Sequence, residues 1–158
     1  MKNQVIFIVD GEFMRDRIFK MKAFFFNGQG IREHCLRHLT PDEELSKILF
    51  YDAYPFMDKG EHPISGPIDF SSTDLVKRKH DFLRSLRETP KIAIRLGRTA
   101  WQQGEWQLHS KKMLALVRRE INMDNVTADD ITAKIRQKGV EWPMICASMS
   151  TTSPISCL

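Results

Sequence analysis

The sequence has few cysteines and no long apolar segment, and both absences narrow the kind of protein it can encode. Its three cysteines, Cys35, Cys146 and Cys157, stand at wide, irregular spacing, which excludes a small disulfide scaffold and shows no metal-ligand pattern. No run of roughly 18 apolar residues is present, so no membrane span is expected. Only five apolar residues precede Asp10, too few for the core of a secretory signal peptide. We therefore expect a cytoplasmic protein that does not bind membranes.

Internal repeats, low-complexity tracts and interdomain linkers are also missing. The chain has 158 residues, of which 42% are hydrophobic and 28% charged, and this profile is typical of one folded domain. Lysine and arginine outnumber aspartate and glutamate by 24 to 20, which gives a net charge of +4. A modest basic excess is compatible with a polyanionic partner, although many unrelated proteins share it.

Three apolar segments predict strands of a parallel sheet. They are rich in β-branched and aromatic residues without alternation, as in strands that are buried on both faces. The segments cover residues 5–9, 47–54 and 91–96. Amphipathic segments lie between them, so the pattern indicates an α/β fold with a mostly parallel sheet. The carboxyl ends of the strands would then bring Asp10, Asp52 and Arg98 to one edge, where open sheets bind ligands.

The intervening segments predict helices by their apolar spacing. The expected helices cover residues 13–25, ended by Gly28 and Gly30, then 31–38, a helix to Glu88 capped by Ser71 or Ser72, and 111–121. The helix that ends at Glu88 should bury Leu75, Phe82, Leu83 and Leu86. Its cations, Lys77, Arg78, Lys79, Arg84 and Arg87, should form a solvated face. Glycine and proline in residues 56–71 predict a long irregular loop.

Four stretches carry a family pattern. They are Val5-Ile6-Phe7-Ile8-Val9-Asp10-Gly11-Glu12, Tyr51-Asp52-Ala53, Arg95-Leu96-Gly97-Arg98 and Gln137-Lys138-Gly139-Val140-Glu141. In this order and spacing they resemble the bacterial branch of the NYN domain family, a PIN-like ribonuclease module. The last stretch is the most specific. The resemblance covers residues 4–141 and implies a three-layer PIN-like or Rossmann-like α/β domain.

The resemblance stops after Glu141. NYN domains normally have Asp at that position, followed by an apolar helix with a further acid and a strand that ends in Ser-Gly-Asp-x-Asp-Phe. Residues 142–158 match none of this and lack helical or strand periodicity, so they should form a poorly packed tail. The resemblance therefore implies a partial NYN-like domain over residues 1–141, incomplete at its C-terminal end. A truncated gene or a change of reading frame would produce this pattern, as would divergence.

The resemblance also implies a chemistry, the hydrolysis of RNA phosphodiester bonds with the help of Mg²⁺ or Mn²⁺. Asp10 and Glu141 would be the catalytic metal ligands, and the longer side chain of Glu141 shifts its carboxylate by roughly one methylene. Because hard-cation affinity depends on the number and placement of charged oxygens, metal binding by this chain should be weak or absent. The alternatives are that Asp10 caps the following helix and that Glu141 is a solvated surface residue.

Five further residues are candidates for the same site. Arg95, Arg98 and Lys138 would bind phosphate or RNA, since guanidinium groups match two phosphate oxygens. Glu12 and Asp52 are second-tier acids; Glu12 could instead start a helix, and Asp52 could anchor the following loop. Solvated surface cations remain the alternative for all three basic residues.

Two functions stay open at this point, beside the hypothesis that the chain is a broken gene product with no function of its own. The first is a divalent-metal ribonuclease, with little or no activity expected of this chain. The second is a non-catalytic RNA-binding or regulatory protein that keeps the fold. RNA is the expected partner in both, and a homodimer is left open.

Overall fold

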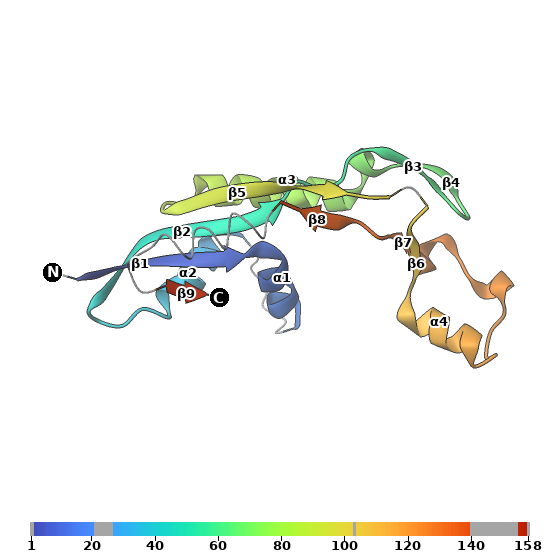
Figure 1. The fold of residues 1–158 in the computed structure, drawn as a ribbon, viewed down its shortest axis with the longest axis horizontal. Coiled ribbons are helices and arrows are strands. Elements are labelled where there is room, and N and C mark those ends of the chain that lie inside the picture. Colours follow the sequence, from blue (N-terminus) through green and yellow to red (C-terminus); the bar gives the residue numbers. More distant parts are fainter. Residues whose placement is uncertain (1, 21–26, 103, 140–154, 158) are drawn as a thin grey trace.

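The computed structural model of this chain describes residues 2–20, 27–102, 104–139 and 155–157. Its elements are β1 (Asn3–Asp10), α1 (Gly11–Lys20), α2 (Gly28–Leu36), β2 (Glu43–Ala53), β3 (Lys59–His62), β4 (Gly66–Asp69), α3 (Asp74–Glu88), β5 (Ile92–Ala100), β6 (Trp106–Leu108), α4 (Ser110–Val117), β7 (Ile131–Ala133), β8 (Arg136–Lys138) and β9 (Ile155–Cys157). Single 3-10 turns cover Phe70–Ser72, Met123–Asn125 and Ala128–Asp130. Helices α1 and α2 lie between β1 and β2 along the chain, and α3 lies between β2 and β5 (Figure 1), so the α/β class is confirmed.

The main sheet has the strand order β8-β5-β2-β1-β9. Strands β1, β2 and β5 are neighbours and run parallel, as the three apolar segments predict. Asp10 pairs with Tyr51, and Tyr51 pairs with Arg95 on the next strand. The three strands therefore end at the same edge, and β8 joins that edge by running antiparallel to β5.

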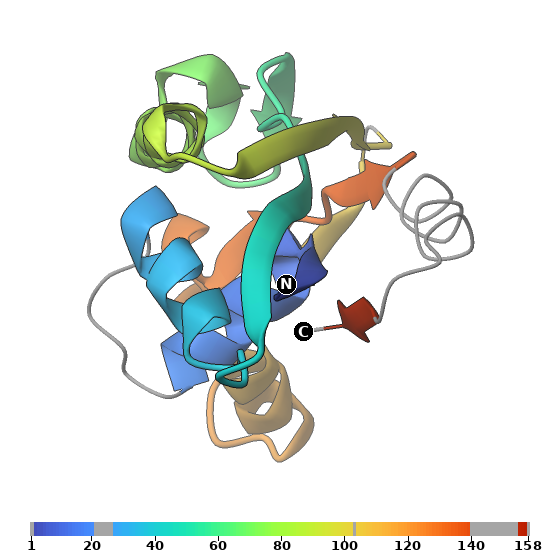
Figure 2. The ribbon, with the colours of Figure 1, turned by 90° about the vertical axis from the view of Figure 1, so that its left-hand side faces the viewer.

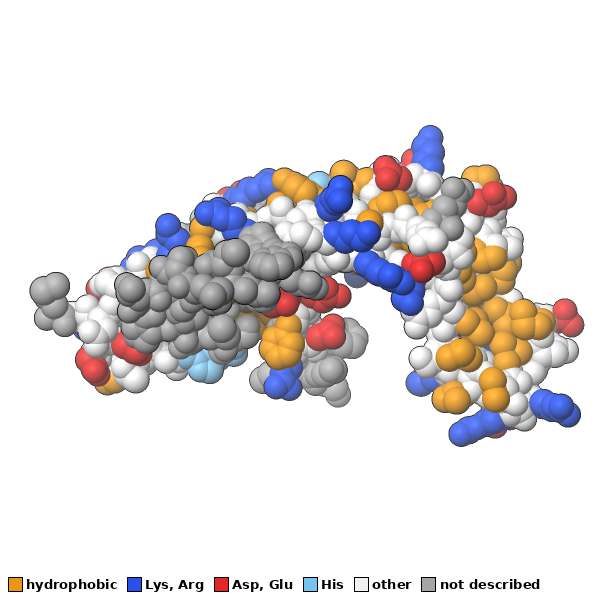
Figure 3. Space-filling view, viewed as in Figure 1, with side chains coloured by type: hydrophobic (Ala, Val, Ile, Leu, Met, Phe, Trp, Pro, Cys, Tyr) orange, Lys and Arg blue, Asp and Glu red, His pale blue; other side chains and the backbone are white. Residues whose placement is uncertain are grey.

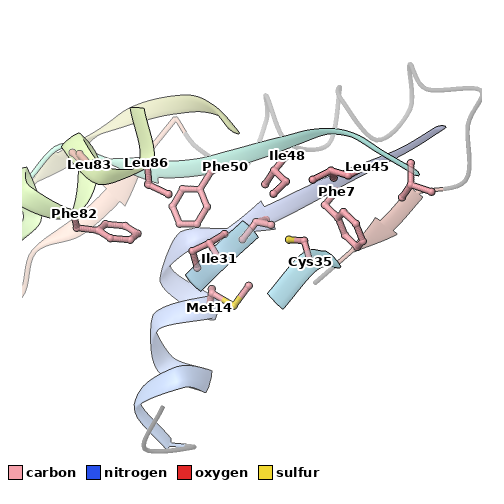
Figure 4. Close-up of a cluster of buried hydrophobic side chains, with 12 residues drawn as sticks. Phe7, Met14, Ile31, Cys35, Leu45, Ile48, Phe50, Phe82, Leu83 and Leu86 are labelled. Atoms are coloured by element: carbon pink, nitrogen blue, oxygen red, sulfur yellow. The ribbon is translucent and has the colours of Figure 1, made fainter. Parts of the chain in front are cut away.

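The core lies on one face of this sheet. Alternate residues of the strands, among them Phe7 and Phe50, point to this face and are fully buried. Helix α1 adds Met14, and helices α2 and α3 add the other helical members of the cluster, including Ile31 and Phe82 (Figure 4). Figure 2 shows α2 and α3 on the same side of β2.

The other face carries a smaller cluster, formed by Ile8, Tyr51 and Ala53 with Leu49 packed against it. Within the described residues the helices that pack on the sheet all contribute to the first face. The structure therefore gives two layers in the described residues, where three layers were expected.

Helix α3 starts later than expected. Ser71 and Ser72 lie in the 3-10 turn that Asp69 caps, and the N-cap of α3 is Thr73. Phe82 packs edge to face on Phe50, with ring centroids 5.7 Å apart. Val76 is buried, whereas Leu75 is 69% exposed, so the expected burial of Leu75 is wrong. Leu75 lies in the first turn of the helix and lines a cavity there instead of packing into the core cluster.

Gly28 begins α2, and Gly30 lies in the first turn of the same helix, although both were expected to break a helix. The side chain of Asn27 caps this helix by accepting the Gly30 N–H at 2.8 Å. A Cβ on Gly28 would lie 2.2 Å from Oγ1 of Thr89 and 2.4 Å from the carbonyl oxygen of Ser85. Glycine therefore lets α2 approach the end of α3 closely.

Residues 56–71 are not the irregular loop that their glycines and prolines predict. Strands β3 and β4 form a hairpin in which His62 pairs with Gly66. Gly66 has φ +78°, the left-handed conformation that glycine adopts readily at the end of a three-residue turn. Nδ1 of His62 accepts the N–H groups of Ile64 and Ser65, each at 3.2 Å. The turn-forming residues thus close a hairpin.

Residues 104–135, which we name the arm, lie between β5 and β8. The short strands β6 and β7 pair antiparallel at its base, and α4 lies beyond them (Figure 1). The helix ends at Val117, earlier than the expected Ile121. No residue of α4 is buried, and hydrophobic side chains gather on this part of the molecule, at the right of Figure 3.

The tail departs from expectation in one place. Ile155–Cys157 forms β9, which runs parallel to β1 and pairs Ile6 with Ile155. Three residues are too few to display the alternation from which a strand could be predicted. Residues 140–154 and 158 lie outside the described part, so the packing expected of them stays a prediction. Among the helices of the described ranges, none is long and apolar enough to cross a membrane.

Candidate functional site

Asp10 ends β1 and begins α1. Its Oδ1 accepts the backbone N–H of Glu12 at 2.9 Å and that of Phe13 at 3.0 Å. These bonds satisfy two donors at the helix start, so Asp10 acts as the N-cap of α1. Glu12 is exposed in the first turn, where the helix dipole favours a negative charge. Asp10 therefore caps the following helix, which is one of the two roles that the sequence left open. Its Oδ1 accepts both capping hydrogen bonds.

Asp52 is the centre of the site. Its side chain is fully buried, and its two oxygens accept hydrogen bonds from four groups. Oδ1 accepts the backbone N–H of Ala53 at 2.8 Å and Nε2 of Gln137 at 3.3 Å. Oδ2 accepts Nη1 of Arg15 at 2.9 Å and Nζ of Lys79 at 2.5 Å. This residue, expected as a second-tier acid, binds more partners than any other acid at the edge.

Several elements bring these groups together. Asp52 lies two residues after Phe50, so the period of two in a strand points it to the face that the helices cover. Arg15 comes from α1, Lys79 from α3 and Gln137 from β8. Gly11 makes the close approach of α1 feasible, because a Cβ there would lie 2.7 Å from the Phe50 ring and 2.9 Å from Oδ2 of Asp52.

The Asp52 cluster contains charges of both signs. Two cations, Arg15 and Lys79, contact the single buried carboxylate of Asp52, and the exposed Glu12 lies near enough to act on Lys79. Burial lowers the pKa of Lys79, and the nearby guanidinium of Arg15 lowers it further, whereas Asp52 and Glu12 raise it. An anion bound beside Lys79 would favour its charged form for the same reason that Asp52 does.

The three basic residues expected to bind phosphate lie in two places: Arg98 and Lys138 lie side by side, and Arg95 lies apart from them on β5. Arg98 pairs with Lys138 across β5 and β8, so these two side chains share one face. Thr99 and Gln137, the next pair along the ladder, line the cavity beside Asp52. Because successive residues alternate in a strand, Arg98 and Lys138 point away from that cavity. Arg95 is exposed and donates to the carbonyl oxygen of Ile94 at 3.3 Å.

A cavity of about 730 Å³ opens beside the Asp52 cluster. Arg15, Lys79 and Gln137, three of the groups that hold Asp52, also line this cavity. Its volume falls in the range of about 300–1,000 Å³ that is usual for ligand sites. The charged residues that line the cavity are Arg15, Arg78, Lys79 and Asp81, so a ligand there would meet more cations than carboxylates.

The structure describes only part of the expected metal site. Over residues 2–20, 27–102, 104–139 and 155–157, no group of three or more His, Cys, Asp or Glu side chains could hold one. Both oxygens of Asp52 already accept hydrogen bonds from cations or neutral donors. Glu141, the second expected ligand, lies outside the described residues.

Sequence reasoning missed Arg15, Lys79 and Gln137. Lys79 was expected on a solvated face, yet its side chain is only 13% exposed. One signal was available: Val76, Lys79 and Leu83 follow the three-and-four spacing of a buried helical stripe. A lysine on such a stripe needs a buried acid as partner, and an acid directly after a buried strand needs a cation.

Comparison with known proteins found no relative of this chain. No family model, no curated protein and no solved structure matches the chain. The function is accordingly inferred from the geometry of the described residues and from the resemblance of the four sequence stretches.

Proposed function

We propose that this chain is an RNA-binding domain of NYN-like, PIN-like type, which holds single-stranded RNA at the carboxyl edge of its sheet and hydrolyses it weakly or not at all. The observation that carries the proposal is the cavity beside Asp52, whose charged lining residues are three cations, Arg15, Arg78 and Lys79, and one carboxylate, Asp81. Phosphate is the common anion of RNA, and arginine and lysine are its usual partners in proteins. The four NYN-like stretches support RNA as the source of that phosphate.

The hydrogen bonds of the acids argue for binding without hydrolysis. Asp10 caps α1, and Asp52 is occupied by Arg15 and Lys79. A hard cation would have to displace these partners to gain carboxylate ligands, which makes a metal site costly. The cations instead leave the edge attractive to a polyanion without any metal.

Metal-dependent RNA hydrolysis is the second candidate. The observation that favours it is that Asp10 and Glu12 flank Gly11 in sequence, and a Cβ on Gly11 would lie 2.9 Å from Oδ2 of Asp52. If Mg²⁺ or Mn²⁺ binds, the resemblance assigns Asp10 and Glu141 as its ligands. Such a metal would supply an activated water for attack on the phosphodiester.

Binding is tested with labelled single-stranded RNA and the Arg15→Gln variant, followed by fluorescence anisotropy at increasing salt. We expect affinity to fall as salt rises, and the variant to lower the slope of log affinity against log salt by about 0.7, the value for one lost phosphate contact with single strands. Arg118→Gln is the matched control, since Arg118 is an exposed arginine of the arm that lies 4.0 Å from Glu120. Equal losses in both variants would mean that RNA does not bind at this edge.

Cleavage is tested in the same preparation with Mg²⁺ or Mn²⁺ added. We expect the RNA to stay intact with the unmodified chain and with Asp10→Asn. Robust cleavage by the unmodified chain that disappears in Asp10→Asn would establish the second candidate in place of the first.

A further inference from the structure

The side chains that line the cavity beside the Asp52 cluster form two sets by their chemistry, which we call the polar wall and the apolar wall. The polar wall includes Arg15, Arg78, Lys79, Asp81 and Gln137. The apolar wall includes Tyr54, Phe56, Phe70, Leu75 and Val76. A ligand that fills both parts must join an anionic group to an apolar one.

The apolar wall is open to water. Leu75 is 69% exposed and Tyr54 is 43% exposed, although both line the cavity. Tyr54 directly follows β2, so it lies next in sequence to Ala53, whose N–H holds Asp52. The apolar residue Tyr54 therefore lies only two positions after Asp52, the acid that binds Arg15 and Lys79.

The aromatic part of this wall is held in place by its own packing. The rings of Phe56 and Phe70 meet edge to face with centroids 5.2 Å apart. Trp101 contacts both rings, at 6.0 Å and 5.7 Å. A Cβ on Gly60 would lie 2.7 Å from the Trp101 ring, so the β3–β4 hairpin packs tightly against this cluster. The cavity is thus formed before any ligand binds, which lowers the entropic cost of binding.

We propose that this cavity receives one base of the bound RNA between Tyr54 and Leu75, with the phosphate of the same nucleotide at Arg15 and Lys79. The proposal rests on the proposed function and adds the nucleobase as the group that the apolar wall recognises. A nucleotide joins a flat ring with two apolar faces to a phosphate, which matches both walls. Stacking on protein side chains contributes to affinity without requiring a particular base.

The test compares two labelled oligomers of equal length and charge, a single-stranded oligouridine and a ribose-phosphate oligomer without bases. Stacking of one base is worth roughly 1–3 kcal/mol, so we expect the unmodified chain to bind the oligouridine about tenfold more tightly. The quantity measured is the ratio of the two dissociation constants, which cancels the electrostatic contribution that both oligomers share.

The Leu75→Gln variant should reduce this ratio toward one. Leu75 is exposed in the first turn of α3, so the variant keeps the core intact. Leu114→Gln is the matched control, because Leu114 is an exposed leucine on α4 that does not line the cavity, and it should leave the ratio unchanged.

The outcomes separate this inference from the proposed function. Equal affinity of the unmodified chain for both oligomers would overturn the base pocket and leave RNA binding in place. Binding of neither oligomer would overturn both proposals. A ratio that falls equally in Leu75→Gln and Leu114→Gln would overturn the placement of the base in this cavity.

Discussion

Helix α4 is more apolar in sequence than helix α3, yet α3 is the helix that buries side chains. The sequence of α4 contains five consecutive apolar residues, Met113–Val117, yet none of its residues is buried. Helix α3 is rich in charged residues and buries Val76, Phe82, Leu83 and Leu86. The difference is that α3 carries its apolar residues on one stripe that faces the sheet, whereas α4 lies beyond the sheet.

The arm and the rest of the molecule also differ in burial. We call the described residues from 2 to 100 the body. The buried residues of the described chain all lie between Val5 and Thr89, within the body. The arm contains turns, capping bonds and the ion pair of Lys112 with Asp130, and a second ion pair joins its Glu105 to Arg136 of β8. Burial requires a neighbouring layer, and in the described residues the main sheet supplies it only to the body.

The largest test of this contrast removes one large side chain from each region. Phe50→Ala should lower the free energy of unfolding by about 3–5 kcal/mol, because it opens a cavity beneath Phe82 in a fully buried cluster. Leu114→Ala, at a site that is 51% exposed, should change it by less than about 0.5 kcal/mol. Urea unfolding monitored by circular dichroism measures both. Similar losses in the two variants would show that the arm has a core of its own.

A smaller difference should separate the buried ion pairs of Asp52 in the body from the ion pair that joins Glu105 of the arm to Arg136 of β8. Asp52→Asn leaves Arg15 and the 13% exposed Lys79 without their carboxylate, and this should cost about 3 kcal/mol. Glu105→Gln removes the partner of Arg136 in a pair whose side chains are 32% and 55% exposed, and should cost about 0–1 kcal/mol. Urea unfolding monitored by circular dichroism measures the loss of unfolding free energy in both variants. A negligible loss in Asp52→Asn would mean that the cluster contributes to binding alone.

The sheet could be predicted from sequence because its signals are local. The segment from Val5 to Val9 identifies a buried strand by composition alone, and the α/β pattern predicts that the three strands are parallel neighbours. Asp10 was placed correctly at a strand end, and its capping role was one of two alternatives that the sequence left open. The hairpin of β3 and β4 was not predicted, because each strand has only four residues and the glycines and prolines in and between them indicate a loop.

The Asp52 cluster could not be predicted in the same way, because its partners are distant in sequence. Lys79, Arg15 and Gln137 lie 27, 37 and 85 residues from Asp52 along the chain. Their meeting depends on how α1, α3 and β8 pack around the end of β2, which no local pattern specifies. The stripe position of Lys79 was the one local hint, and the surrounding cations of α3 obscured it.

The smallest expected effect is confined to one turn of the arm. Oδ2 of Asp130 accepts the N–H and the hydroxyl of Thr127, each at 2.9 Å, and lies 3.1 Å from Nζ of Lys112. The backbone hydrogen bond from Thr127 is the main cause that lowers the pKa of Asp130 below its ordinary value of 3.8, and Lys112 lowers it further. A lowered pKa in the folded state means that these bonds stabilise the turn above the ordinary pKa. Their contribution is lost as the pH falls through the lower native pKa.

The backbone amide resonance of Thr127 reports this titration directly. Its shift with falling pH should have a midpoint below 3.8, the ordinary pKa of an aspartate. In Asp130→Asn the acid-induced shift should disappear, since the amide side chain does not titrate in this range. The amide resonances of the described residues of β1 and β2 serve as an internal reference for the body. A Thr127 shift centred at or above 3.8 would mean that Thr127 and Lys112 do not hold Asp130 in solution, and that the arm is looser than its hydrogen bonds indicate.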